Sequence, residues 1–128
     1  METITLKELA WLHDCVLLDV TYDASSEAGR LVKWRMRCPA DLGYAPWNGK
    51  ELVLLAVDVY MLRHIAWGFV AGAETVNAIR PGISDDAQKT TVDARLAGIR
   101  FPDIEFTIDM HSGSWIEVVC RKLEVQIL

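Results

Sequence analysis

The pattern of the amino-acid sequence indicates an α+β fold, with an antiparallel sheet of about five or six strands covered on one face by helix. Two hairpin patterns support the sheet, because residues 15–38 and residues 104–128 each contain two runs of alternating apolar and polar side chains around a polar turn. Helical patterns at the N-terminus and near residues 84–97 support the helices. A sheet curled toward a half-open barrel is the nearest variant of this fold.

The composition is that of a single globular domain spanning residues 1–128. Hydrophobic residues make up 52% of the chain and charged residues 24%, and this balance excludes a disordered chain. A chain of this length buries enough surface to fold without a disulfide or a metal ion. The slight apolar excess leaves surface for a dimer interface or a ligand pocket.

The charge of the chain argues against two classes of partner. Its 13 Lys and Arg against 18 Asp and Glu give a formal net charge of −5, which disfavours nucleic acid and anionic membrane surfaces. The N-terminal residues 1–5 carry no signal sequence, and Asp58 and Arg63 interrupt the most apolar stretch, residues 52–73, before it reaches the ~20 residues of a membrane helix. We therefore expect a soluble, cytoplasmic protein that does not enter a membrane.

Three cysteines, Cys15, Cys38 and Cys120, lie far apart in the sequence. Their odd number and long spacing do not suggest a disulfide framework. Each has apolar neighbours, where a thiol behaves as a small hydrophobic group and stays neutral, so we expect reduced core thiols rather than a nucleophile.

The first predicted element is a helix from Thr5 to His13. Thr5 and Glu8 have the spacing of a capping box, in which a hydroxyl and a carboxylate each accept a backbone N–H, and apolar residues then recur at helical spacing. A strand follows at residues 15–22. Its expected core face consists of Val16, Leu18, Val20 and Tyr22.

Residues 31–38 form the clearest strand of the sequence. Apolar side chains at even positions alternate with basic side chains at odd positions, as in an antiparallel sheet with one solvated face. The apolar members are Val32, Trp34, Met36 and Cys38, and the basic members are Lys33, Arg35 and Arg37. The polar segment 23–29 makes this strand the hairpin partner of the preceding one.

Three further elements are predicted in the middle of the chain. Residues 52–62 are apolar and suit a central strand buried on both faces, with a helix as the competing interpretation. Residues 75–79 suit a short strand. Ser84 can cap a helix over residues 84–97 whose first turn is acidic, although the β-branched residues 90–92 disfavour it.

The second hairpin joins residues 104–110 to residues 115–128 through a turn at 111–114. In the last strand the apolar side chains change from even positions to odd positions. Because side chains alternate between the faces of a strand, this change predicts a bulge or a bend near Arg121 and Lys122, or the end of the strand there.

The adjacent His13 and Asp14 are candidates for a metal site or for acid–base chemistry, since imidazole and carboxylate groups serve both. The other histidines, His64 and His111, lie in no motif with ligand spacing. We favour a structural role, in which Asp14 ends the helix or binds backbone at the turn, and we expect no metal ion or cofactor.

The basic stripe, defined as Lys33, Arg35 and Arg37, is the most distinct charge feature of this acidic chain. It suits a docking surface for an acidic partner or a phosphate group. The interpretation we favour is pairing across the sheet with acidic residues of neighbouring strands. The candidate partners are Asp19, Glu105, Asp109 and Glu117.

Five tryptophans are many for a chain of this length. Trp34 lies on a predicted core face. Trp47 and Trp67 lie in loop-like segments together with Tyr44 and Phe69, where aromatic side chains either form an interface or cap the open end of the core. Both interpretations stay open.

Residues 12–23 have the sequence Leu-His-Asp-Cys-Val-Leu-Leu-Asp-Val-Thr-Tyr-Asp, a Leu-His-Asp motif followed by a strand and then Tyr-Asp. This opening resembles that of small, uncharacterised β-rich bacterial proteins, some of which are similar to immunity proteins of bacterial toxin systems. The resemblance is confined to this segment and carries no catalytic residue. It implies a binding protein rather than an enzyme.

These features favour a non-enzymatic binding or protein-interaction domain, and the apolar excess favours a homodimer. The alternative is a small-molecule-binding protein or an enzyme whose curved sheet encloses a pocket. Trp34, Met36, Tyr60 and Trp67 would line that pocket. A third class, nucleic-acid binding through the basic stripe, is the one that the net charge favours least.

Overall fold

The computed structural model describes residues 2–24, 30–40, 47–65, 74–98 and 104–128. In these ranges the chain forms an antiparallel sheet with helices, which confirms the predicted α+β fold. The strands are β1 (Glu2–Thr3), β2 (Val16–Asp23), β3 (Leu31–Arg37), β4 (Glu51–Ile65), β5 (Glu74–Pro81), β6 (Ile104–Met110) and β7 (Trp115–Ile127). The helical elements are α1 (Leu6–Leu9), the 3₁₀ turn η1 (Ala10–Leu12) and α2 (Asp85–Leu96).

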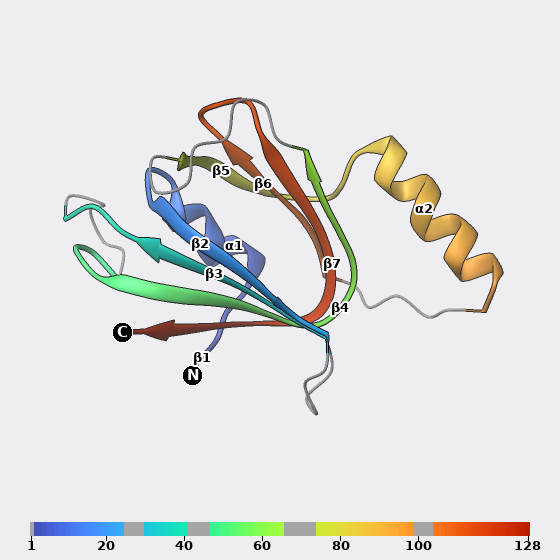
Figure 1. Cartoon of the computed structure of the whole chain (residues 1–128), viewed down its shortest axis with the longest axis horizontal. Coiled ribbons are helices and arrows are strands. Elements are labelled where there is room, and N and C mark those ends of the chain that lie inside the picture. The colour runs from blue at the N-terminus through green and yellow to red at the C-terminus, as the bar shows by residue number, and fades with distance from the viewer. Residues whose placement is uncertain (1, 25–29, 41–46, 66–73, 99–103) are drawn as a thin grey trace.

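The sheet closes into a ring. Its strands follow the order β1-β7-β4-β3-β2-β5-β6, and β6 pairs back to β7, which confirms the expected curl. The seam between β2 and β5 is short, because among the described residues it consists of the pairs Val16–Thr75 and Leu17–Glu74. Past this seam the described part of β2 pairs with β3 alone, and the sheet opens into two halves (Figure 1).

The two halves are joined by β4 and β7, which run side by side through a common bend (Figure 1). Asp58 lies at this bend with a left-handed φ of 53°, and its carboxylate is 2.7 Å from Nε of Arg121 on β7. The side chains of β7 that belong to the main core lie at even positions up to Cys120 and at odd positions from Leu123 onward. The change of parity near Arg121 and Lys122 is therefore a bend within one strand, not the end of a strand.

The core lies between the two halves of the sheet. Trp34 of β3 and Phe106 of β6 meet edge to face there, with ring centroids 6.1 Å apart. The apolar face predicted for residues 31–38 is buried, and the apolar segment 52–62 belongs to strand β4 rather than to a helix. Leu9 and Leu12 place α1 and η1 on this core and against β5.

The N-terminal helix is shorter than predicted, and its capping box does not form. The side chain of Thr5 makes no hydrogen bond at the helix end, whereas its carbonyl accepts the backbone N–H groups of Glu8 and Leu9, at 3.1 and 3.3 Å. α1 is followed directly by η1 from Ala10. The burial of Leu9 and Leu12 holds this segment in place, because so short a helix is not stable by itself.

The core face of β2 differs from the predicted one because the strand contains a bulge. The pairing of β2 with β3 shifts register between Leu17 and Asp19, so Leu17 is buried and Leu18 only partly so. Val20 and Tyr22 lie on the side of Leu17 but are 38% and 54% exposed, because this end of β2 has passed its seam with β5. Two apolar side chains expected in the core therefore reach the surface.

The second predicted helix is confirmed as α2. Ser84 caps it, since its hydroxyl accepts the backbone N–H of Ala87 at 3.2 Å. Ile83 and Ala87 pack with Val119 of β7 in a second cluster, separate from the main core. The rest of α2 projects from the sheet, and its Leu96 is 83% exposed (Figure 1). None of the described helices has the length and apolar character needed to cross a bilayer.

Candidate functional site

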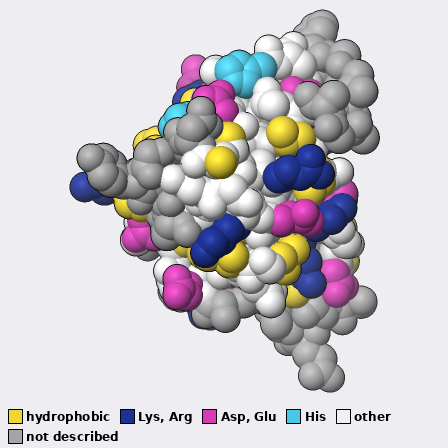
Figure 2. All heavy atoms as spheres, turned by 90° about the vertical axis from the view of Figure 1, so that its left-hand side faces the viewer, with side chains coloured by type: hydrophobic (Ala, Val, Ile, Leu, Met, Phe, Trp, Pro, Cys, Tyr) yellow, Lys and Arg dark blue, Asp and Glu magenta, His cyan; other side chains and the backbone are white. Residues whose placement is uncertain are grey.

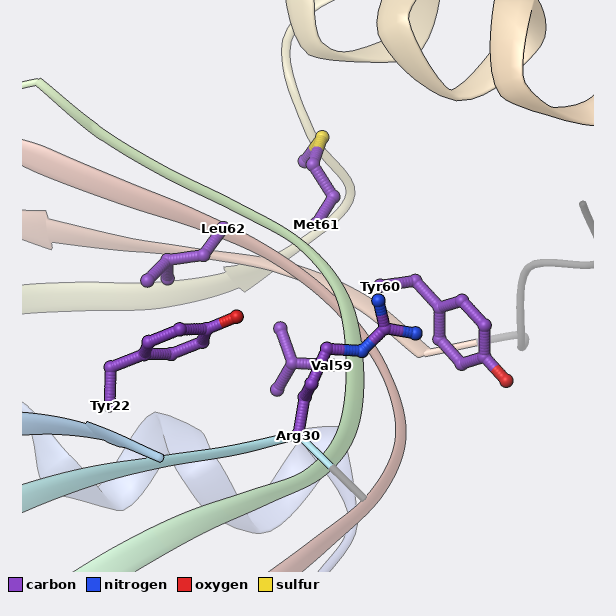
Figure 3. Close-up of a pocket in the computed structure, with 6 residues that line it drawn as sticks. All are labelled: Tyr22, Arg30, Val59, Tyr60, Met61 and Leu62. Atoms are coloured by element: carbon purple, nitrogen blue, oxygen red, sulfur yellow. The ribbon is translucent and has the colours of Figure 1, made fainter. Parts of the chain in front are cut away.

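The edge groove, as we name it, is a hollow of about 310 Å³ beside the bend of β4 (Figure 3). Its lining comes from the end of β2, from the residue before β3 and from β4 just past the bend. The lining residues are Tyr22, Arg30, Val59, Tyr60, Met61 and Leu62.

The groove exists because β4 separates from β3 at the bend. The β3–β4 ladder reaches Leu31 and Val57, and one further hydrogen bond joins the N–H of Val59 to the carbonyl of Arg30 at 3.0 Å. Past this point the described residues of β4 pair with β7 alone. Within the part of the chain that the structure describes, β4 and β2 therefore each have, beside this hollow, one edge with no strand paired to it.

A register shift between Val59 and Met61 spreads the side chains of β4 around the bend. Leu62 lies on the side of Tyr22, whereas Met61 points toward α2 (Figure 3). Met61 packs there against the cluster beneath α2. The wall of the groove that faces Tyr22 is consequently aliphatic, formed by Val59 and Leu62.

The groove is apolar with a cation at one end. Tyr22 and Leu62 expose large apolar side chains to solvent. The guanidinium of Arg30 lies over the ring of Tyr60, 5.2 Å from its centroid, in a cation–π arrangement. Such a surface suits contact with an apolar group that has a negative charge beside it.

The aromatic residues predicted at an interface occupy different places. Trp34 and Met36 are fully buried in the core, so neither lines an open pocket inside the curved sheet. Trp47 is buried with its ring 6.2 Å from that of Trp11, which supports the interpretation that it caps the core. Tyr60 lies in the edge groove. Tyr44, Trp67 and Phe69 lie outside the described residues.

The structure brings His111 to the pair His13–Asp14, a contact that no sequence signal indicates. Hydrogen bonds of 3.2 Å join Asp14 Oδ2 to His13 Nδ1 and Asp14 Oδ1 to His111 Nε2. Figure 2 shows histidine side chains beside an acidic one on the molecular surface. These bonds, first the one from His111, lower the pKa of the Asp14 carboxyl. Asp14 also binds backbone at this turn, because its N–H donates to the carbonyl of Val76 at 2.7 Å.

This polar cluster joins strands to one another. Glu74 of β5 is buried, and its carboxylate accepts the hydroxyl of Ser112 in the β6–β7 turn at 2.8 Å. Asp14 and His111 connect that turn to the start of β2. His13, Asp14 and His111 are each about half exposed, and in the described ranges no three His, Cys, Asp or Glu side chains are arranged to hold a metal ion.

The basic stripe is partly neutralised by neighbouring strands. Arg35 donates to Asp19 on β2 at 2.9 Å and to Glu51 on β4 at 2.7 Å, and these bonds, first the one to Asp19, raise its pKa. The predicted pairing across the sheet is therefore confirmed for Arg35 and Asp19. Lys33 and Arg37 are exposed on either side of Arg35.

Glu117 was expected beside the basic stripe, and this expectation is wrong. The residue is fully buried: its Oε1 accepts from Arg63 and from Trp115, both at 3.1 Å, and its Oε2 accepts the N–H of Ser84 at 2.7 Å. Burial raises the pKa of this carboxyl, but the bonds from Ser84 and Trp115 and the charge of Arg63 outweigh burial and hold the pKa below its ordinary value. Glu117 thus fastens the start of α2 to β7.

The edge groove combines exposed apolar side chains, strand edges that no described strand covers, and a cation, which are features of a binding surface. No protein-family model, curated protein or solved structure matches this chain. The geometry of the edge groove is therefore the main support for a function.

Proposed function

We propose that this protein is a non-enzymatic binding protein that self-associates, with a second copy seated on the edge groove. One observation supports this most: Val20, Tyr22 and Leu62 are exposed where, among the described residues, β2 pairs with β3 alone and β4 pairs with β7 alone. Contiguous exposed apolar side chains mark interaction surfaces. Open strand edges do the same, because their N–H and carbonyl groups are available to another chain.

A second copy is the occupant that the shape of the surface favours. The surface places the exposed apolar side chains of Val20 and Tyr22 on β2 beside a hollow that Val59 and Leu62 of β4 also line. In a two-fold dimer each molecule presents the same patch to the other. A patch that contains both exposed apolar side chains and a hollow can therefore complement itself.

Net charge sets the conditions for this association. Each copy carries a formal net charge of −5, so two copies repel each other. Salt limits that repulsion to a range of about 8 Å at physiological ionic strength. We expect the dimer to become tighter as salt is added, which is the opposite of what a contact made of ion pairs would do.

Sedimentation velocity over a range of protein and salt concentrations tests the proposal. We expect a species of twice the 14.4 kDa chain mass, whose fraction grows with both concentrations. Tyr22→Lys and Leu62→Glu each place a charge in the groove and should yield monomer. Both side chains are partly exposed already, so the free energy of unfolding should change by no more than about 0.5 kcal/mol.

Leu96→Glu is the matched control, since Leu96 is a large, exposed apolar side chain on α2 rather than at the groove. This variant should still dimerise. A wild-type chain that is monomeric at every concentration would overturn the proposal. A dimer that Leu96→Glu dissociates and Leu62→Glu does not would also overturn it, because the interface would then lie on α2.

Arg30 favours a second candidate, a small-molecule site in the same groove. Its guanidinium beside the ring of Tyr60 suits an anionic group, and about 310 Å³ lies at the lower end of the ~300–1,000 Å³ of ligand sites. A thermal-shift screen with anionic metabolites tests this candidate. A stabilising ligand whose effect is lost in Arg30→Ala and kept in the matched Arg37→Ala supports it, and an effect kept in both variants rejects it.

The resemblance of residues 12–23 to small bacterial proteins, some of them similar to immunity proteins, supports the same class of function. A cytoplasmic location is part of the proposal, and the three free cysteines support it. A protein partner of different sequence would use the same open edges, and in that case the isolated chain would sediment as a monomer.

A further inference from the structure

Cys15, the residue before β2, and Cys38, the residue after β3, face each other. Their sulfur atoms lie 2.8 Å apart, and both residues are buried. The third cysteine, Cys120, is buried on β7. Two thiols in contact differ chemically from the isolated core thiols that the sequence predicts.

The backbone holds the two cysteines in register. The last pair of the β2–β3 ladder is Val16 with Arg37, and continuing this register by one residue places Cys15 opposite Cys38. Neither cysteine directs its N–H at the other. The N–H of Cys15 donates to the carbonyl of Leu12 at 3.2 Å, and the N–H of Cys38 donates to the carbonyl of Lys50 at 2.9 Å. This position corresponds to a non-hydrogen-bonded pair of an antiparallel ladder. In such pairs Cα atoms generally lie about 4.5 Å apart, and a disulfide accepts separations from ~4.4 Å.

The contact gives the two thiols different acidities. The hydrogen bond from Cys15 lowers the pKa of Cys38. The same bond, together with burial, raises the pKa of Cys15. Cys38 is therefore the thiol that ionises first, and the thiolate is the form that attacks an oxidant.

We propose that Cys15 and Cys38 are a redox modification site, which a hydroperoxide converts to a disulfide. The Cys38 thiolate attacks one oxygen of hydrogen peroxide, the O–O bond breaks, and the departing oxygen takes up the proton that Cys38 released and leaves as water. Cys38 is then a sulfenic acid. The sulfur of Cys15 attacks the sulfur of Cys38, the S–O bond breaks, and the hydroxyl leaves as water with the proton of Cys15. Two electrons pass from the two sulfurs to the peroxide.

Burial determines which oxidant can act. Cys15 and Cys38 are 0% and 3% exposed, so a peptide disulfide such as oxidised glutathione does not reach either sulfur in the folded chain. Hydrogen peroxide is close to water in size. Disulfides of cytosolic proteins are usually transient and redox-sensing, and a disulfide of this kind is compatible with a protein that folds reduced.

The cross-link would tie together the base of the β2–β3 hairpin, whose other end borders the edge groove. It closes a loop that contains both strands. A cross-link that closes this loop reduces the conformational freedom of the unfolded chain. The oxidised protein should therefore unfold at a higher temperature than the reduced protein.

Treatment of the native chain with hydrogen peroxide, followed by peptide mapping without reduction, tests the proposal. We expect a cross-linked peptide pair that contains Cys15 and Cys38, and a mass lower by two hydrogen atoms per chain. Alkylation after unfolding should find one free thiol, that of Cys120. The midpoint of thermal unfolding should rise on oxidation and return on reduction.

Cys120→Ser is the matched control and should form the same cross-link. Cys15→Ser should instead accumulate a sulfenic acid on Cys38, which a dimedone label detects. Free Cys15 and Cys38 in the peroxide-treated wild-type chain would overturn the proposal, and so would a cross-link that involves Cys120. These two results come from the wild-type chain, so a folding defect in a serine variant does not affect them.

Discussion

Glu117 connects three elements through one carboxylate. It lies on β7 and binds Arg63 on β4 and the backbone N–H of Ser84 at the start of α2. The start of a helix also favours a negative charge through the helix dipole. A buried carboxylate is tolerated only while such partners remain, because an unpaired charge in the protein interior is costly.

We expect Glu117→Ala to lower the free energy of unfolding by about 2–3 kcal/mol, because it leaves the N–H of Ser84 without an acceptor and Arg63 without its buried partner. Glu117→Gln keeps an amide oxygen in place and should cost less. Urea unfolding followed by circular dichroism measures both values. A Glu117→Ala variant as stable as the wild type would show that the buried carboxylate does not hold α2 to the sheet.

The same carboxyl makes stability depend on pH. Its pKa in the folded protein lies below the ordinary value of 4.5, so in acid the folded chain binds fewer protons than the unfolded chain. This stabilisation is fully present above pH 4.5 and is lost as the pH falls through the folded-state pKa. Glu117→Gln should flatten this part of the curve of unfolding free energy against pH. An unchanged slope in Glu117→Gln would contradict the assignment.

The shared bend of β4 and β7 depends on an unusual backbone conformation. Asp58 has a left-handed φ of 53°, which Asp and Asn tolerate and β-branched residues do not. The ion pair between Asp58 and Arg121 joins the two strands at the same point. Because β4 leaves β3 just after Asp58, the edge groove is a consequence of this bend.

Asp58→Val should therefore lower the free energy of unfolding by about 2 kcal/mol, the cost of forcing a β-branched residue into this conformation. Asp58→Asn keeps the left-handed tolerance and loses only an ion pair whose Arg121 side is exposed and whose Asp58 side is partly buried, so its cost should be about 1 kcal/mol. Chemical denaturation of the two variants measures the difference. Equal losses would indicate that the ion pair, and not the backbone, holds the bend.

The hairpins and α2 could be predicted because their signals are local. The alternation around Trp34 and the capping position of Ser84 each depend on residues close together in the chain. The bulge beside Leu17 could not be predicted, because it follows from pairing on two sides of β2. The early end of α1 likewise follows from the burial of Leu9 and Leu12 against other elements.

The strands of the ring differ in how many neighbouring strands they pair with. β7 is paired with β4, with β6 and with β1, whereas the described part of β2 past Leu17 has β3 as its partner on one side. Backbone N–H groups paired on a covered strand exchange with solvent only through large openings, and those on an open edge exchange through small ones.

Hydrogen exchange measured by NMR should show this difference. We expect the amides of residues 116–120 on β7 to be the slowest and the amides of residues 19–23 on β2 to exchange much earlier. In the dimer that we propose, exchange at residues 19–23 should become slower as the protein concentration rises. Residues 19–23 as well protected as β7 in a dilute sample would contradict an open edge.

Local sequence patterns were sufficient for the α+β class, for both hairpins, for α2 and for the burial of Trp34. Contacts between distant segments were needed to find the edge groove at Tyr22 and Leu62, the hydrogen bond between Asp14 and His111, and the thiol pair. The reason is physical: the period-two pattern of a strand specifies which face a side chain points to. Whether a neighbouring element covers that face depends on where strands bend and how the sheet closes.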